Sequence, residues 1–101
     1  MNNNWRNKQW ANINSIEDLN CILESIRNGI GYVNKLCSEG KAYIEDTQYI
    51  LEDFERFSLG VKKLEVCKLA KKEDIEELIK RKDKYNEDLK WLNTRIMCCR
   101  D

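Results

Sequence analysis

Apolar residues recur along most of the chain at alternating steps of three and four residues, the spacing that places them on one side of an α-helix. The first run consists of Leu19, Leu23, Ile26, Ile30, Val33 and Cys37. The second consists of Tyr43, Thr47, Ile50, Phe54, Phe57, Val61 and Leu64, with Ile44 and Leu51 widening it. The third consists of Ile75, Leu78, Tyr85, Leu89, Leu92 and Ile96. These stripes predict three amphipathic helices, each burying one side against its neighbours.

Local signals indicate where the predicted helices begin and end. Ser15 is followed by Asp18 at the third position, which is typical of a helix N-terminus because both side chains can accept backbone N–H groups. Gly40 suits the left-handed residue that follows a helix, so the first helix is expected to end just before it. Glu73 and Asp74 complement the positive end of a helix dipole and are expected to open the third helix.

Two glycines lie inside the predicted helices, where a glycine costs about 1 kcal/mol relative to alanine. Gly29 lies beside the buried stripe of the first helix. The missing side chain there would let another helix or an aromatic ring approach closely, although simple tolerance of glycine explains it equally well. Gly60 lies within the second register, where we expect a kink after Ser58 and a helix that continues.

The pattern predicts an all-α fold, a three-helix bundle running up-down-up over residues 15–101 and preceded by a polar N-terminal arm over residues 1–14. An alternative is a helical hairpin whose long C-terminal helix forms a coiled-coil dimer, because the second register continues unbroken into the third and no proline interrupts it. Lys68, Lys71 and Lys82 would then occupy the seam, which argues against this alternative. We therefore favour the bundle, with a turn over residues 70–74.

The composition fits a soluble, cytoplasmic protein of one domain. The 101 residues are 42% hydrophobic and 36% charged, and the 18 basic and 18 acidic side chains cancel. Zero net charge removes the simplest argument for a nucleic-acid or membrane partner. The N-terminal residues lack the apolar stretch of a secretory signal, and no apolar run is long enough to span a membrane. The five cysteines, an odd number, fit a reducing compartment.

The residue types that carry most catalysis are missing. The chain has no histidine, which removes the commonest general base and every Ser-His-Asp or Cys-His arrangement. No glycine-rich phosphate loop follows a strand pattern. Neighbouring acids are common, but on a helix they point about 100° apart, as in an ordinary solvated face. We therefore expect no enzymatic activity, no cofactor and no metal site.

The interpretation that remains is a small module that binds another protein as an adaptor, a regulator or an inhibitor, such as one encoded by a phage or a mobile element. Tryptophan and arginine in the arm are typical of binding hot spots. An acidic stretch in the second helix could face a basic groove of a partner, or order antiparallel neighbours within the fold. The predicted partner-binding residues are Trp5, Arg6, Trp10, Glu45, Asp46, Glu52 and Asp53. We also expect a homo-oligomer, most simply a dimer, because the aromatic-rich stripes exceed what one small bundle covers.

Two other functions stay open. Lysines in the middle of the chain could bind a single-stranded nucleic acid, with the tryptophans as stacking groups, although acidic residues are interleaved with them. These lysines are Lys62, Lys63, Lys68, Lys71 and Lys72. Cys98 and Cys99 could form a thiol-based metal or redox site. Reactive thiols need an activating environment, however, and the chain lacks the Cys-x-x-Cys spacing of a zinc site.

Overall fold

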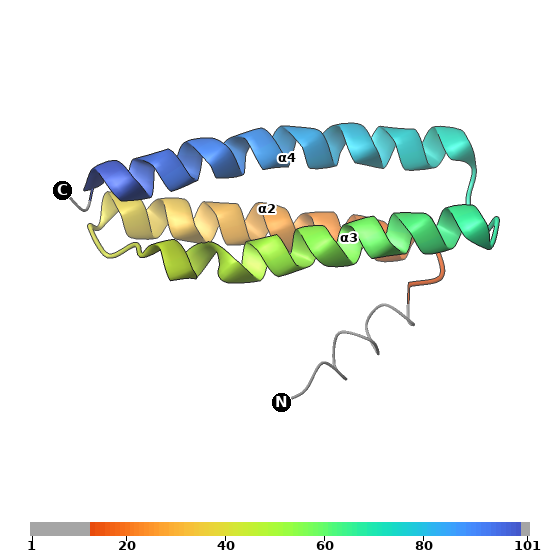
Figure 1. Cartoon of the computed structure of the whole chain (residues 1–101), viewed down its shortest axis with the longest axis horizontal. Helices are drawn as coiled ribbons and strands as arrows, with labels where there is room; N and C mark the ends of the chain where they lie inside the picture. The colour runs from red at the N-terminus through yellow and green to blue at the C-terminus, as the bar shows by residue number, and fades with distance from the viewer. Residues whose placement is uncertain (1–12, 100–101) are drawn as a thin grey trace, which may run out of the picture.

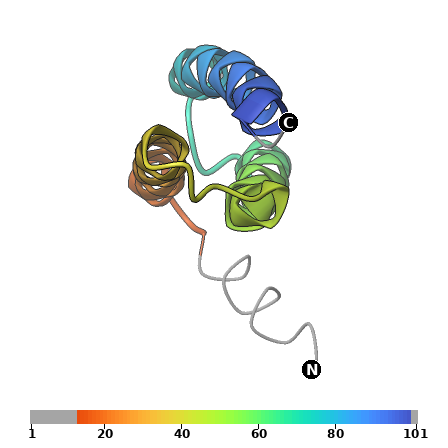
Figure 2. The same cartoon turned by 90° about the vertical axis from the view of Figure 1, so that its left-hand side faces the viewer.

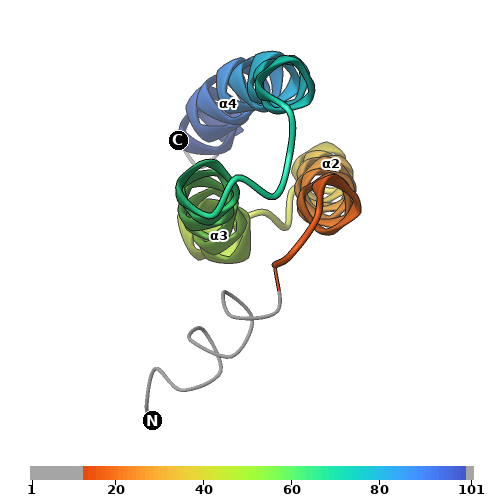
Figure 3. The same cartoon turned by 90° about the vertical axis from the view of Figure 1, so that its right-hand side faces the viewer.

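The computed structural model describes residues 13–99, which form three α-helices and one short 3-10 helix (Figure 1). These are α2 (Ile16–Ser38), η1 (Ile44–Thr47), α3 (Gln48–Val66) and α4 (Lys72–Cys99). α3 runs antiparallel to α2, and α4 returns in the direction of α2. Viewed from either end, the three helices form a triangle (Figures 2 and 3). The predicted all-α bundle with up-down-up order is confirmed.

The first helix begins and ends where the sequence indicates. The hydroxyl of Ser15 accepts the backbone N–H of Asp18 at 3.3 Å, and the carboxylate of Asp18 accepts the backbone N–H of Asn14 at 2.7 Å. At the other end α2 stops at Ser38, and Gly40 adopts the left-handed conformation with φ of 69°. These contacts satisfy backbone groups that a helix end would otherwise leave unpaired.

The second helix starts later than the hydrophobic register suggests, because its first turn is tighter. Residues Ile44–Thr47 form η1, and α3 follows directly from Gln48. Asp46 stabilises this start, since its carboxylate accepts the backbone N–H of Tyr43 at 2.8 Å. The hydroxyl of the buried Thr47 donates to the carbonyl of Ile44 at 2.7 Å.

A turn after Val66 rules out the coiled-coil alternative. Lys68 has a φ of 55°, which takes the chain out of the helical path, and the backbone N–H of Leu69 donates to the carbonyl of Leu64 at 3.0 Å. α4 then starts at Lys72. The continuous helix expected under that alternative is therefore wrong, and the turn lies slightly before the predicted residues 70–74.

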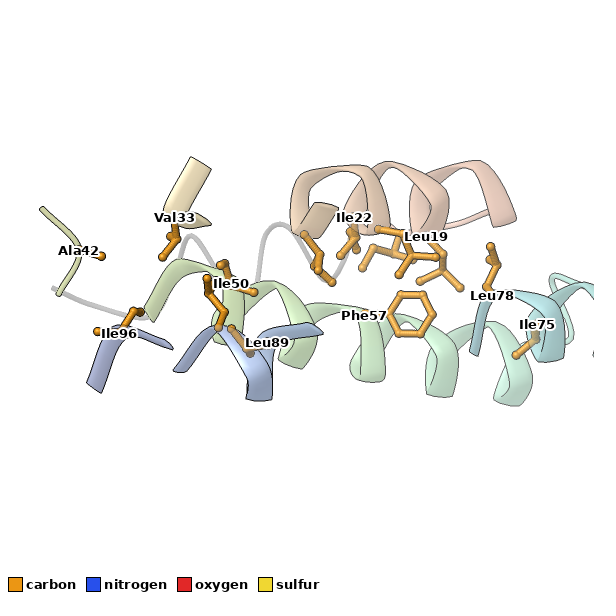
Figure 4. Packing of buried hydrophobic residues seen from close by; sticks show 14 of the residues in the cluster. Leu19, Ile22, Val33, Ala42, Ile50, Phe57, Ile75, Leu78, Leu89 and Ile96 are labelled. Atoms are coloured by element: carbon orange, nitrogen blue, oxygen red, sulfur yellow. The ribbon is translucent and has the colours of Figure 1, made fainter. Parts of the chain in front are cut away.

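The core runs along the axis of the triangle and takes side chains from all three α-helices. Phe57, Leu64 and Ile50 supply the α3 side, and in Figure 4 the ring of Phe57 points toward Leu19 of α2. Ile13 is also fully part of this core, so the packed unit begins within the stretch predicted as the arm. Burial of such side chains contributes about 1.5–3 kcal/mol each, which is the main term holding the bundle together.

Two glycines allow α2 and α3 to approach closely. A Cβ on Gly29 would lie 2.9 Å from Cγ1 of Ile50, and a Cβ on Gly60 would lie 2.7 Å from Cδ2 of Leu19 and 3.0 Å from Ile13. Of the two explanations considered for Gly29, the structure supports the close approach of another helix. α3 continues through Gly60 without interruption. The glycine expected to mark a kink is therefore explained by the space it leaves for Leu19 and Ile13.

Candidate protein-interaction surface

α3 carries apolar side chains on two sides, and only one of them faces the core. Ile50 and Phe57 are buried against the other helices, whereas Leu51 and Leu59 are 44% and 45% exposed. In the end-on views α3 occupies one corner of the triangle, so one side of it is not covered by α2 or α4 (Figures 2 and 3). Phe54 lies between these two sides and is half-buried. The uncovered side therefore combines apolar surface with access from solvent.

A shallow groove follows this uncovered side of α3. Its described lining residues are Gln48, Leu51, Phe54, Glu55, Ser58 and Leu59. The space above them amounts to about 690 Å³ and is open to solvent. Small-molecule sites are usually enclosed clefts that surround most of a ligand. An open groove along one helix is instead the kind of surface into which another helix packs.

The four acidic residues predicted to bind a partner lie in η1 and the first half of α3, close to this groove, and the structure gives them different roles. Glu45 lies in η1 and is exposed, whereas Glu52 lies in α3 and is half-buried. Of the acidic residues on α3, Glu55 lines the groove. Asp46 caps its own helix turn, as described above. The partner-binding role of all four residues stays a prediction.

Asp53 belongs to a polar cluster at the edge of the contact between α2 and α3. Its carboxylate accepts the hydroxyl of Ser25 on α2 at 2.7 Å and pairs with the guanidinium of Arg56 at 2.7 Å. The side chains of Asp53 and Arg56 are only 14% and 23% exposed. Nε of Arg56 is buried and has no hydrogen-bond partner among the described residues. The carboxylate of Asp53 therefore supplies the opposite charge that balances this partly buried guanidinium. Asp53 thus helps to hold α3 against α2.

The remaining predicted partner-binding residues, Trp5, Arg6 and Trp10, lie outside the described residues. The five lysines of the nucleic-acid alternative do gather at one end of the bundle, where α3 passes into α4. They are distributed over the end of α3, the turn and the start of α4, and Lys63 donates to the side chain of Asn14 at 3.0 Å. Exposed acids accompany them, including Glu65 and Glu73, so this end of the bundle carries both signs of charge.

The thiols do not gather into a site in the described part of the chain. Cys37 is buried in the core, as the hydrophobic pattern predicts, and Cys98 is exposed near the end of α4. Between residues 13 and 99, no three cysteine or acidic side chains lie where they could share a metal ion. The side chain of Cys99 lies outside the described residues, so the alternative of a thiol-based metal or redox site at Cys98 and Cys99 stays untested. None of the described helices has the length and apolar character needed to cross a membrane.

The apolar part of the α3 groove is the feature that the sequence interpretation missed. Leu51 appears in the sequence as an extension of the core stripe, and Leu59 falls outside every stripe. The signal that could have found them is a second apolar run, one or two residues beyond the core positions of the same helix, which passes through Leu51, Leu59 and Val66. Exposed tyrosines add to the apolar surface elsewhere, namely Tyr32, Tyr43 and Tyr49.

Comparisons of the chain with models of protein families, with curated proteins and with solved structures found no match.

Proposed function

We propose that this protein is a small helical interaction module that binds another protein through the uncovered side of α3. The observation that supports this most directly is the exposed apolar surface of Leu51 and Leu59, which line a groove on the side of α3 that faces away from the core. Apolar surface that the fold leaves open, rimmed by polar residues, is typical of protein-binding sites.

The shape and charge of the groove suggest the chemistry of the partner. A helix face with apolar side chains at intervals of three and four residues accepts an amphipathic helix laid along it. Glu45, Glu52 and Glu55 lie on the same half of the η1–α3 segment. A partner that places basic residues opposite them gains electrostatic complementarity, which increases association rate and specificity.

Site-specific crosslinking tests this proposal directly. The photoreactive residue p-benzoylphenylalanine replaces Leu59 in the groove, or Lys84 on the exposed surface of α4 as the matched control. Both variants are produced in the native host, irradiated and analysed for shifted bands. We expect position 59 to crosslink to a protein and position 84 to give little product. Equal crosslinking at both positions, or none at position 59, would overturn the proposal.

The same experiment distinguishes protein binding from the nucleic-acid alternative. A crosslinker in place of Lys72, at the lysine-rich end, should yield no nuclease-sensitive product if the module binds proteins. A nuclease-sensitive product at that position, together with binding that weakens steeply as salt rises, would favour the alternative instead.

A further inference from the structure

We infer that the partner of the α3 groove is a second copy of this chain, with the two α3 helices packed antiparallel across a two-fold axis. This inference rests on the proposed function, because it assigns an occupant to the same surface. Homodimers most often use such self-complementary contacts, in which each residue faces the counterpart of another residue on the same patch.

The exposed residues of α3 fit this arrangement by their spacing. Leu51, Glu55, Ser58, Lys62 and Val66 follow one another at steps of three and four residues and are all exposed. Residues with this spacing share one face of a helix. If the axis passes between Ser58 and Leu59, Leu51 faces Val66 of the second copy. Val66 is 76% exposed, and this pairing would remove two aliphatic side chains from water at each end of the interface.

The centre of the proposed interface is small and mixed in character. Ser58 and Leu59 lie next to the axis, so each serine faces a leucine of the second copy. A small side chain opposite a large one lets two helices approach closely while the larger side chain fills the space. Leu59 therefore inserts beside Ser58 of the other copy, and the groove lined by Phe54 and Ser58 receives it.

The charges of α3 select the antiparallel orientation. Its first half carries Glu52, Asp53 and Glu55 with one arginine, whereas its second half carries Lys62 and Lys63 with one glutamate. An antiparallel pair places Glu55 opposite Lys62 of the second copy, twice per dimer. A parallel pair would place like charges side by side, which is unfavourable. A carboxylate accepts several hydrogen bonds, so Glu55 can form this pair alongside contacts within its own chain.

Charge-reversal variants, studied alone and as a mixture, test whether a second copy occupies the groove and whether the two α3 helices are antiparallel. Glu55→Lys and Lys62→Glu each place like charges across the interface, so we expect each variant alone to dimerise roughly tenfold more weakly or worse. In a mixture of the two variants, both cross-pairs become attractive, and heterodimers should form. The double variant Glu55→Lys/Lys62→Glu restores both pairs within one sequence and should dimerise nearly as well as the original chain.

Two kinds of control keep the experiment decisive. Glu87→Lys and Lys84→Glu make the same charge changes on exposed positions of α4 and should leave dimerisation unchanged. Leu59→Asp should abolish it, whereas Tyr32→Asp, at an exposed aromatic position on α2, should not. Dimerisation is measured by sedimentation and light scattering over a wide concentration range, and the far-UV circular dichroism of each variant checks that it remains folded.

A chain that stays monomeric at all concentrations, or single charge variants that dimerise as well as the original, would overturn this inference. Such a result is distinguishable from failure of the proposed function. If position 59 crosslinks to a different protein while the purified chain is a monomer, the interaction module stands and the second copy is the wrong occupant. If position 59 crosslinks to nothing, both proposals fail.

Discussion

Alanine substitutions at Gly29 and Gly31 should change the stability of the bundle in opposite directions, although both lie in α2 only two residues apart. The perturbation is the same single methyl group. A Cβ on Gly31 meets no atom within 4 Å, whereas a Cβ on Gly29 lies 2.9 Å from Cγ1 of Ile50. Ile50 is buried and branched at Cβ, so its Cγ1 cannot swing aside as the tip of a long side chain can.

The magnitudes follow from two competing terms. Replacing glycine by alanine inside a helix stabilises it by about 1 kcal/mol, because alanine loses less backbone freedom on folding. Forcing an extra methyl group into a packed core costs about 1–3 kcal/mol. Gly31→Ala gains the first term alone, so we expect stabilisation of about 0.5–1 kcal/mol. At Gly29 the second term exceeds the first, and we expect net destabilisation of roughly 0.5–2 kcal/mol.

Thermal and urea unfolding followed by circular dichroism measure both changes. For a domain of this size 1 kcal/mol corresponds to about 4–8 °C in Tm, so the two variants should separate clearly. A third variant isolates the contact. In a chain carrying Ile50→Ala, which removes Cγ1, Gly29→Ala should no longer destabilise and should partly fill the vacated space. Equal stabilisation by Gly29→Ala and Gly31→Ala in the original chain would refute the close approach of α2 and α3.

Two further changes test the turn and the polar cluster. Lys68→Gly should stabilise the protein by about 0.5–1 kcal/mol in urea unfolding, because a side chain at positive φ is strained and glycine relieves that strain; a loss of stability would contradict the left-handed turn. Asp53→Ala should destabilise by roughly 1–3 kcal/mol, because it leaves the largely buried guanidinium of Arg56 without its carboxylate. As its control, Glu87→Ala removes the exposed pair with Lys90 and should change stability by less than about 0.5 kcal/mol.

The helices themselves could be predicted from the sequence because their signals are local. The steps of three and four residues around Leu23, Ile26 and Val33 give the buried side of α2 directly. Ser15 and Gly40 give its ends, since each has a chemical property that a helix terminus requires. Such features depend on residues within one or two turns, which a single sequence displays in full.

The turn and the outer surface were harder to predict because they depend on packing between segments. A lysine rarely takes the left-handed conformation, so Lys68 gives no warning of the turn, and the hydrophobic register passes through it unchanged. The register places Ile50 in the core stripe and predicts that Leu51 widens the stripe, but Leu51 is 44% exposed. Ile50 packs against α2, where its Cγ1 would lie 2.9 Å from a Cβ on Gly29, and α2 leaves Leu51 uncovered.

Two neighbouring apolar stripes explain why α3 has more apolar surface than the bundle covers. Ile50, Phe57 and Leu64 form the stripe that the bundle buries. A second stripe, one or two residues further along at Leu51, Leu59 and Val66, widens the apolar arc beyond what α2 and α4 can cover. A helix that served the fold alone would tend to place polar residues at these positions, as most of the outer surface of α4 does. The extra stripe on α3 is therefore the basis of the proposed contact outside the bundle, and the charge gradient along the same helix favours the antiparallel arrangement if the partner is a second copy.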